Sequence, residues 1–251
     1  MIEQSRRGDI AVLTMAHGKA NALDIELLEA ITAQFEKLRG APERAVVLTG
    51  QGRMFSAGVD LPRLADGGPD YVRRFLPALH RLYETVFFFP KPVVAAVNGH
   101  AIAGGCVLEC CADKRIAARD NFRIGVTELL VGVPFPAMAF EVMRFATAPQ
   151  YFADGILSGA TYPPDVALAR GLVDELVEPA ALLDRAVAAA ETLAALPART
   201  FEVTKRQIRQ PAADAMERHA PHIDKVAEEI WTSPATIEHI RGYVARTFKK
   251  G

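Results

Sequence analysis

Two short apolar segments, residues 45–50 and 92–98, constrain the fold of this chain more than any other feature. Each has the length of one β-strand, and a strand that is apolar along its whole length must be covered on both faces. Between them, apolar side chains recur at helical spacing from Tyr71 to Val86. The order strand, helix, strand predicts a right-handed crossover connection and therefore a largely parallel sheet.

Further elements extend this α/β pattern on both sides. Residues 9–15 predict a strand, and Asp24 is placed to cap a helix that ends at Gly40. Residues 115–118 predict a weaker strand, after a short helix that begins near Gly104.

From Ala180 onward, the sequence predicts helices only and is richer in Ala, Glu and Arg. We therefore expect an α/β core over residues 1–178 and a helical region over residues 179–251. A helical region of this size needs a surface to pack on, either the core of its own chain or a neighbouring subunit.

Composition and charge exclude several classes of protein. The net charge of −1 argues against a general nucleic-acid binder. The most apolar stretch, residues 86–108, is interrupted by Pro, Lys, Asn and His, so we expect no membrane span. The first eight residues lack the apolar centre of a signal peptide, and we expect a cytoplasmic protein. The three cysteines are too close together for a disulfide framework, which fits a reducing compartment: Cys106, Cys110 and Cys111.

Two glycine-containing loops, residues 52–61 and 98–106, follow the two clearest strands. Ligands of open α/β sheets bind beyond the carboxyl ends of the strands, where glycine lets the backbone approach closely. Gly104 and Gly105 also open a predicted helix, whose free N–H groups suit a developing oxyanion. The alternative is that these glycines serve only as tight turns.

Motifs of other enzyme classes are missing from the sequence. Neither loop is a P-loop or a dinucleotide-binding loop. Ser56 does not lie in the G-x-S-x-G turn of α/β-hydrolases, so we expect it to be structural. The histidines and cysteines lack the spacing of zinc sites, and we expect no metal.

Several segments, in order, resemble the crotonase superfamily of enoyl-CoA hydratases and isomerases. The resemblance covers residues 21–177 and implies a spiral of ββα units followed by an all-helical region, which is a trimerisation region in that family. The segments are Asn21-Ala22-Leu23, FSAGVDL at 55–61, KPVVAAVNG at 91–99, AGGC at 103–106, LSG at 157–159 and ALARGLV at 167–173.

By this resemblance, the main-chain N–H groups of Val59 and Gly104 form an oxyanion hole for a thioester carbonyl. The substrate is then an acyl-CoA, no separate cofactor is needed, and the assembly is a homotrimer or a dimer of trimers. The family pattern places coenzyme A along Lys19, Ala20, Ala57, Asp60 and Leu61. Candidates for binding its phosphates, which could equally be solvated surface charges, are Lys19, Arg63, Lys249 and Lys250.

The chain departs from the hydratase pattern at one of two glutamates. Hydratases of this family carry one glutamate just after the G-G-C segment, where this chain has Val107. Glu128 occupies the place of the second. Glu109, two residues beyond Val107, points about 200° around the helix and cannot simply replace the first.

A single glutamate resembles the pattern of Δ3,Δ2-enoyl-CoA isomerases, in which one carboxylate moves a proton between two carbons. We expect Leu129, Leu130 and Val131 to desolvate Glu128 and raise its pKa toward neutrality. Three alternatives stay open. In the first, Glu128 is only a loop carboxylate that caps the next element. In the second, the chain is a hydratase, or another crotonase-type lyase or hydrolase, in which Glu109 or another group acts. In the third, the chain binds acyl-CoA or a protein without catalysis.

Overall fold

The computed structural model describes residues 1–247, and its larger sheet has six strands in the order β1-β2-β3-β5-β7-β10. Lys249 and Lys250 lie outside the described residues. The strands predicted at residues 9–15, 45–50, 92–98 and 115–118 are all confirmed. The bounds are β1 (Ile2–Arg7), β2 (Ile10–Met15), β3 (Ala45–Gly50), β5 (Val93–Val97), β7 (Lys114–Ala118) and β10 (Glu175–Val177).

Every neighbouring pair in this sheet is parallel except β1 and β2, which form an antiparallel hairpin. In the middle of the sheet, Val47 lies between Val12 of β2 and Val94 of β5. All residues of β3 and β5 are buried, as their wholly apolar sequences predict. The hairpin strand β1 has a mostly exposed side-chain pattern, which is why its sequence gave no strand signal.

A smaller sheet stands beside the larger one and was not predicted from the sequence. Its four strands, in spatial order, contain only two or three residues each: β4 (Met54–Ser56), β6 (His100–Ile102), β8 (Ile124–Gly125) and β9 (Thr161–Tyr162). Along the chain, β3, β5 and β7 are each followed by one strand of this smaller sheet and then by a helix. The fold is therefore the expected spiral of ββα units.

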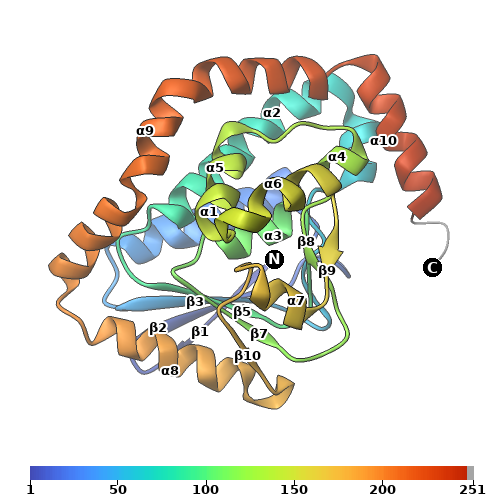
Figure 1. Cartoon of the computed structure of the whole chain (residues 1–251). Helices are drawn as coiled ribbons and strands as arrows, with labels where there is room; N and C mark the ends of the chain where they lie inside the picture. The colour runs from blue at the N-terminus through green and yellow to red at the C-terminus, as the bar shows by residue number, and fades with distance from the viewer. Residues whose placement is uncertain (248–251) are drawn as a thin grey trace.

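The helices cover both faces of the larger sheet (Figure 1). Among the described helices, none combines the length and apolar character needed to cross a membrane. The helix predicted over 71–86 begins earlier, at Leu61, and is broken at Gly68. The bounds are α1 (Ile25–Arg39), α2 (Leu61–Phe87), α3 (Gly104–Cys110), α4 (Glu128–Val131), α5 (Ala137–Ala146), α6 (Pro149–Ser158), α7 (Pro164–Ala169), η1 (Pro179–Ala181), α8 (Leu182–Ala194), α9 (Ala198–Trp231) and α10 (Pro234–Thr247).

The C-terminal helices pack on the core of their own chain. Helix α8 lies against β3, β5 and β7, on the face of the sheet opposite α1 and α3 (Figure 1). Helix α9 then arches over α5 and α2, and α10 packs on α2 and α4. Helix α8 belongs to the region after residue 178 but packs on the sheet of the core. The division at residue 178 stays a prediction.

A buried ion cluster ties α9 to the end of α3. Asp113 accepts hydrogen bonds from Lys205 Nζ at 2.6 Å and from Arg209 Nη2 at 2.8 Å. Arg209 also donates to the carbonyl of Cys111 at 3.2 Å, and its guanidinium lies over the ring of Phe87. One carboxylate thus balances two cations whose side chains are almost fully buried.

Substitution of Asp113 should be strongly destabilising, because it leaves two buried cations without their counter-ion. We expect Asp113→Asn to lower the free energy of unfolding by about 3 kcal/mol, measured by urea denaturation. Asp70→Asn is the matched control, because Asp70 pairs with Arg73 at the surface and the Asp70 side chain is 94% exposed. Equal unfolding midpoints for Asp113→Asn and the unmodified protein would contradict this role.

Candidate active site

Residues 20–24 hold the first glycine loop in place through the backbone. The N–H of Leu23 donates to the carbonyl of Gly58 at 2.8 Å, and the N–H of Asp60 donates back to Leu23 at 3.0 Å. The carbonyl of Gly58 and the N–H of Val59 belong to one trans peptide, so they point in opposite directions. The N–H of Val59 is therefore directed away from Leu23.

In the second loop, the direction of the Gly104 N–H follows from the hydrogen bonds of the Ala103 carbonyl. The carbonyl of Ala103 accepts from the N–H groups of Cys106 and Val107, at 2.9 and 3.1 Å, in the first turn of α3. The N–H of Gly104 lies in the same peptide and points away from that turn. Within residues 1–247, neither this N–H nor that of Val59 donates to another main-chain group.

The two loops touch at Gly58. A Cβ atom at this position would lie 2.6 Å from the carbonyl oxygen of Ile102 and 3.0 Å from the nitrogen of Gly104. Gly58 also has a φ of +81°, a conformation that favours glycine. The close approach places the residue before Val59 against the main-chain nitrogen of Gly104.

Side chains beneath the first loop make it rigid. The amide of Asn21 donates to the carbonyls of Met54 and Phe55, both at 3.2 Å. The buried hydroxyl of Ser56 donates to the carbonyl of Asn21 at 2.7 Å and accepts from the N–H of Gly58 at 3.2 Å. These contacts explain the Asn-Ala-Leu segment, and they agree with a structural role for Ser56.

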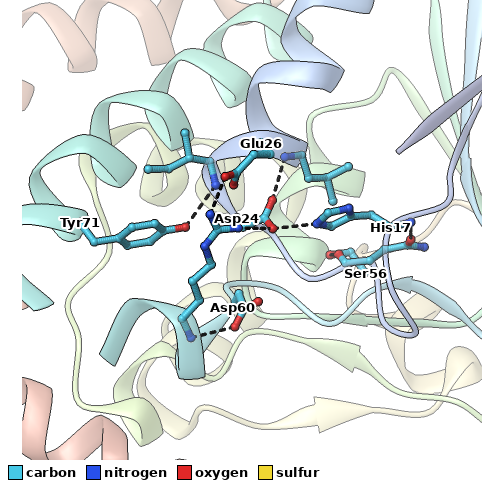
Figure 2. Close-up of polar contacts among 10 residues, drawn as sticks. His17, Asp24, Glu26, Ser56, Asp60 and Tyr71 are labelled. Carbon is cyan, nitrogen blue, oxygen red and sulfur yellow. Dashed lines mark hydrogen bonds and ion pairs between the residues drawn. The ribbon is translucent and has the colours of Figure 1, made fainter. Parts of the chain in front are cut away.

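A polar network joins the first loop to α1 and α2 (Figure 2). Asp24 caps α1 through the N–H of Leu27 and also accepts from His17 Nε2 at 2.7 Å and Arg63 Nη1 at 2.9 Å. Burial opposes ionisation of Asp24, but these three contacts outweigh it and hold its pKa below the ordinary value. Arg63 also pairs with Glu26, so two carboxylates balance its charge. This pairing weakens Arg63 as a candidate for binding phosphate.

The other residues expected along coenzyme A lie at the rim of the same loop. Ala20 accepts a hydrogen bond from the N–H of Ala57 at 3.0 Å, and both are half-buried. Asp60 caps α2 by accepting from the N–H of Arg63, and Leu61 is the first residue of that helix. Lys19 is exposed beside Ala20. Leu61 is buried, and Lys249 and Lys250 lie outside the described residues.

Glu128 begins α4, and its residue is 9% exposed. Burial raises the pKa of its carboxyl group to about 7, although the nearby N–H groups of Glu128 and Thr127 favour ionisation. One carboxyl oxygen is buried and has no hydrogen-bond partner in the described chain. A carboxyl group in this setting is suited to exchange a proton near neutral pH.

The source of this desolvation differs from the sequence prediction. Leu129 and Leu130 are 40% and 50% exposed, so they point outward, and only Val131 of the three is buried. A helix turn of four residues cannot direct consecutive side chains to the same face. Helix α10 packs on α4, and His239 lies against Gly132 at its end.

The segment that leads into Glu128 lies beside the second loop, because the N–H of Ala103 donates to the carbonyl of Gly125 at 2.8 Å. The charge of Glu128 also contributes to the raised pKa of both Tyr83 and Cys106. The hydroxyl of Tyr83 donates to the carbonyl oxygen of Gly104 at 3.0 Å. The start of α3, Tyr83 of α2 and the segment before Glu128 therefore lie side by side. Nothing in the sequence singles out Tyr83, because it is one of several apolar positions along α2.

Glu109 has different neighbours. Its carboxyl group is fully buried with the thiols of Cys106 and Cys110, and the three donor atoms lie within 4.8 Å of one another. Burial and the charge of Cys110 raise the pKa of Glu109 well above its ordinary value, against the effect of Arg115. These donors are of types that metals use, so the expectation of a metal-free protein stays a prediction.

Comparisons with known proteins agree with this architecture. A family model described as enoyl-CoA hydratase/isomerase matches residues 5–245. A putative enoyl-CoA hydratase of Thermus thermophilus is 33% identical over 207 residues, which cover 80% of this chain and 81% of that protein. The mitochondrial enoyl-CoA delta isomerase 1 of Mus musculus is 30% identical over 219 residues, which cover 85% and 75%.

The likeness extends to solved structures. The crystal structure of human mitochondrial delta3-delta2-enoyl-CoA isomerase superposes with a TM-score of 0.93, covering 99% of this chain and 98% of the human one. At 23% identity this similarity shows a shared fold, including the C-terminal helices. The family model spans nearly the whole chain, and the two relatives cover most of it. The chain therefore belongs to the enoyl-CoA hydratase/isomerase family of the crotonase superfamily.

Proposed function

We propose that this enzyme moves the double bond of a 3-enoyl-CoA into conjugation with the thioester. The observation that carries the proposal is the carboxyl group of Glu128, which has a pKa of about 7 and follows a segment hydrogen-bonded to the loop that holds Gly104. Val107, at the place of the first hydratase glutamate, is apolar and fully buried. One carboxyl group is sufficient for a proton transfer between two carbons of the same substrate.

The proposed reaction has two proton transfers. Carboxylate Glu128 removes a proton from C2, and the electron pair moves onto the thioester oxygen as the dienolate forms. The N–H groups of Val59 and Gly104 stabilise that oxygen. The protonated Glu128 then returns the proton to C4, and the electrons close the new double bond between C2 and C3. Protein groups supply both functions, so the scheme needs no metal or redox cofactor.

Hydration requires more than this arrangement supplies. Water addition needs one group to activate water and another to deliver a proton to carbon. The buried carboxyl group of Glu109 is grouped with the thiols of Cys106 and Cys110. Isomerisation is therefore the better-supported reaction within the family, and hydration remains an outcome of the tests below.

We also propose a cytoplasmic homotrimer or dimer of trimers. Several large apolar side chains are exposed along α6, α7 and α9, where a partner subunit would cover them: Leu157, Val166, Leu168, Val203, Ile208 and Ile223. The three cysteines are free and buried, which is compatible with a reducing compartment.

The first test compares two substrates. With a 3-enoyl-CoA, we expect the absorbance of a conjugated thioester to appear, and with a 2-enoyl-CoA in water we expect little loss of it.

Glu128→Gln should lower the isomerase kcat by about 10²–10⁴-fold, because the proton acceptor is removed. Glu109→Gln is the control and should keep most of the activity. Retained activity in Glu128→Gln, or rapid loss of the 2-enoyl absorbance, would contradict the proposal. Binding of CoA esters without either reaction would instead favour a non-catalytic role.

The second test is the pH dependence of kcat/KM for the 3-enoyl-CoA. Glu128 must be deprotonated to accept the C2 proton, so the rate should rise with pH and level off above a midpoint near 7. A midpoint near 4.5, the ordinary value for glutamate, would mean that Glu128 is not desolvated in the free enzyme. Glu109→Gln should leave this midpoint unchanged.

The third test disturbs the close contact between the two loops. In Gly58→Ala, the new methyl group meets the carbonyl of Ile102 and the nitrogen of Gly104, so the oxyanion donors must move apart. We expect kcat to fall by about 10²-fold or more. Gly52→Ala is the matched control, because Gly52 also has a positive φ but nothing lies within 4 Å of its added methyl group. If both variants lost activity equally, backbone strain alone would account for the effect.

A further inference from the structure

One face of α3 points at the phenol of Tyr83 on α2. Residues 104, 107 and 111 lie three and four positions apart, so they share one face of that helix. The Tyr83 hydroxyl donates to the carbonyl of Gly104 at 3.0 Å, and Cys111 contributes to its raised pKa. Val107 lies between Gly104 and Cys111 on that face. The contact that is fixed by geometry is the one between the buried Tyr83 hydroxyl and Gly104.

The backbone just before Gly104 is strained. Ala103 has φ +51° and ψ −124°, a combination that a residue with a Cβ atom rarely adopts. Rotation of the 103–104 peptide would relieve this strain and turn the Gly104 N–H away from the loop around Gly58. Contacts on both sides of the peptide must therefore oppose the rotation.

The N–H groups of Cys106 and Val107 hold the carbonyl of Ala103 in the first turn of α3, and two further contacts hold the neighbouring peptide units. On one side, the N–H of Ala103 donates to the carbonyl of Gly125 at 2.8 Å. On the other, Tyr83 holds the carbonyl of Gly104 itself. The fit is close, because a Cβ atom at residue 104 would lie 2.8 Å from the Tyr83 oxygen.

We infer that Tyr83 is a positioning residue that keeps the Gly104 N–H aimed at the thioester oxygen. The inference rests on the proposed oxyanion hole. Burial, Cys111 and Glu128 raise the pKa of Tyr83 well above its ordinary value, so the phenol stays protonated and remains a donor while Glu128 changes its charge. Tyr83 acts through the Gly104 peptide and has no contact with the substrate in this scheme.

Tyr83→Phe tests the inference by removing one oxygen and keeping the ring. A chromophoric aryl-enoyl-CoA is the probe, because its absorbance moves to longer wavelength when donors polarise the thioester carbonyl. We expect a clear red shift with the unmodified enzyme and a much smaller one with Tyr83→Phe at saturating probe. With a 3-enoyl-CoA, kcat should fall about tenfold and KM should change much less, since an oxyanion donor acts mainly in the transition state.

Tyr162→Phe is the matched control. The Tyr162 hydroxyl is buried in the smaller sheet and has no hydrogen-bond partner in the described chain, so its loss should change neither the red shift nor kcat. Thermal unfolding of both variants shows whether either change merely loosens the fold.

The outcomes separate this inference from the proposed function. A full red shift and unchanged kcat in Tyr83→Phe would overturn the role of Tyr83 and leave the oxyanion hole intact. A reduced red shift in both tyrosine variants would also overturn it, because the effect would then be one of general packing. No red shift in the unmodified enzyme with bound probe would overturn the oxyanion hole and this inference together. The spectral reading needs no turnover, so it stands even if Glu128 proves not to be the base.

Discussion

The site depends on the close approach of two backbone segments at Gly58. The carbonyl of Gly58 is held by Leu23, and its Cα passes so near the second loop that a methyl group would collide with Ile102. This contact sets the separation of the Val59 and Gly104 N–H groups. Hydrogen bonds from main-chain donors are catalytically useful only when the donors are fixed in advance, because reorganisation would cost the free energy that they contribute.

The repeated ββα unit explains why these segments meet. Strands β3 and β5 are neighbours in the larger sheet, and β4 and β6, which follow them, are neighbours in the smaller one. Each repeat therefore delivers its loop to the same edge. The next repeat, through β7 and β8, delivers Glu128 at the start of α4 beside β8. Val59, Gly104 and Glu128 come from three successive repeats; α2 and α5 pack on α3, and α10 packs on α4.

Sequence patterns predicted the parts of this fold that are governed by local chemistry. The wholly apolar runs of β3 and β5, the cap at Asp24 and the helix opening at Gly104 are all confirmed. The strands of the smaller sheet were missed, because two or three residues are too few to show a period. The positions of Val59, Gly104 and Glu128 came from the family resemblance and could not be derived from spacing.

Sequence patterns could not predict the contacts between residues that lie far apart in the chain. Leu129 and Leu130 looked like cover for Glu128 but face outward, and α10, more than a hundred residues away, packs on the same short helix α4. Arg63 looked like a free cation, but Asp24 and Glu26 already balance it. Tyr83 looked like one more core residue of α2, because nothing nearby in the sequence indicates its hydrogen bond to Gly104.

A crystal structure with a bound, unreactive acyl-CoA tests the central claim most directly. The account predicts that the thioester oxygen lies about 3 Å from both the Val59 and the Gly104 nitrogen atoms, with the Glu128 carboxyl group facing C2 and C4 of the acyl chain. A thioester oxygen bound elsewhere, or a Glu128 side chain turned away from the acyl chain, would contradict it.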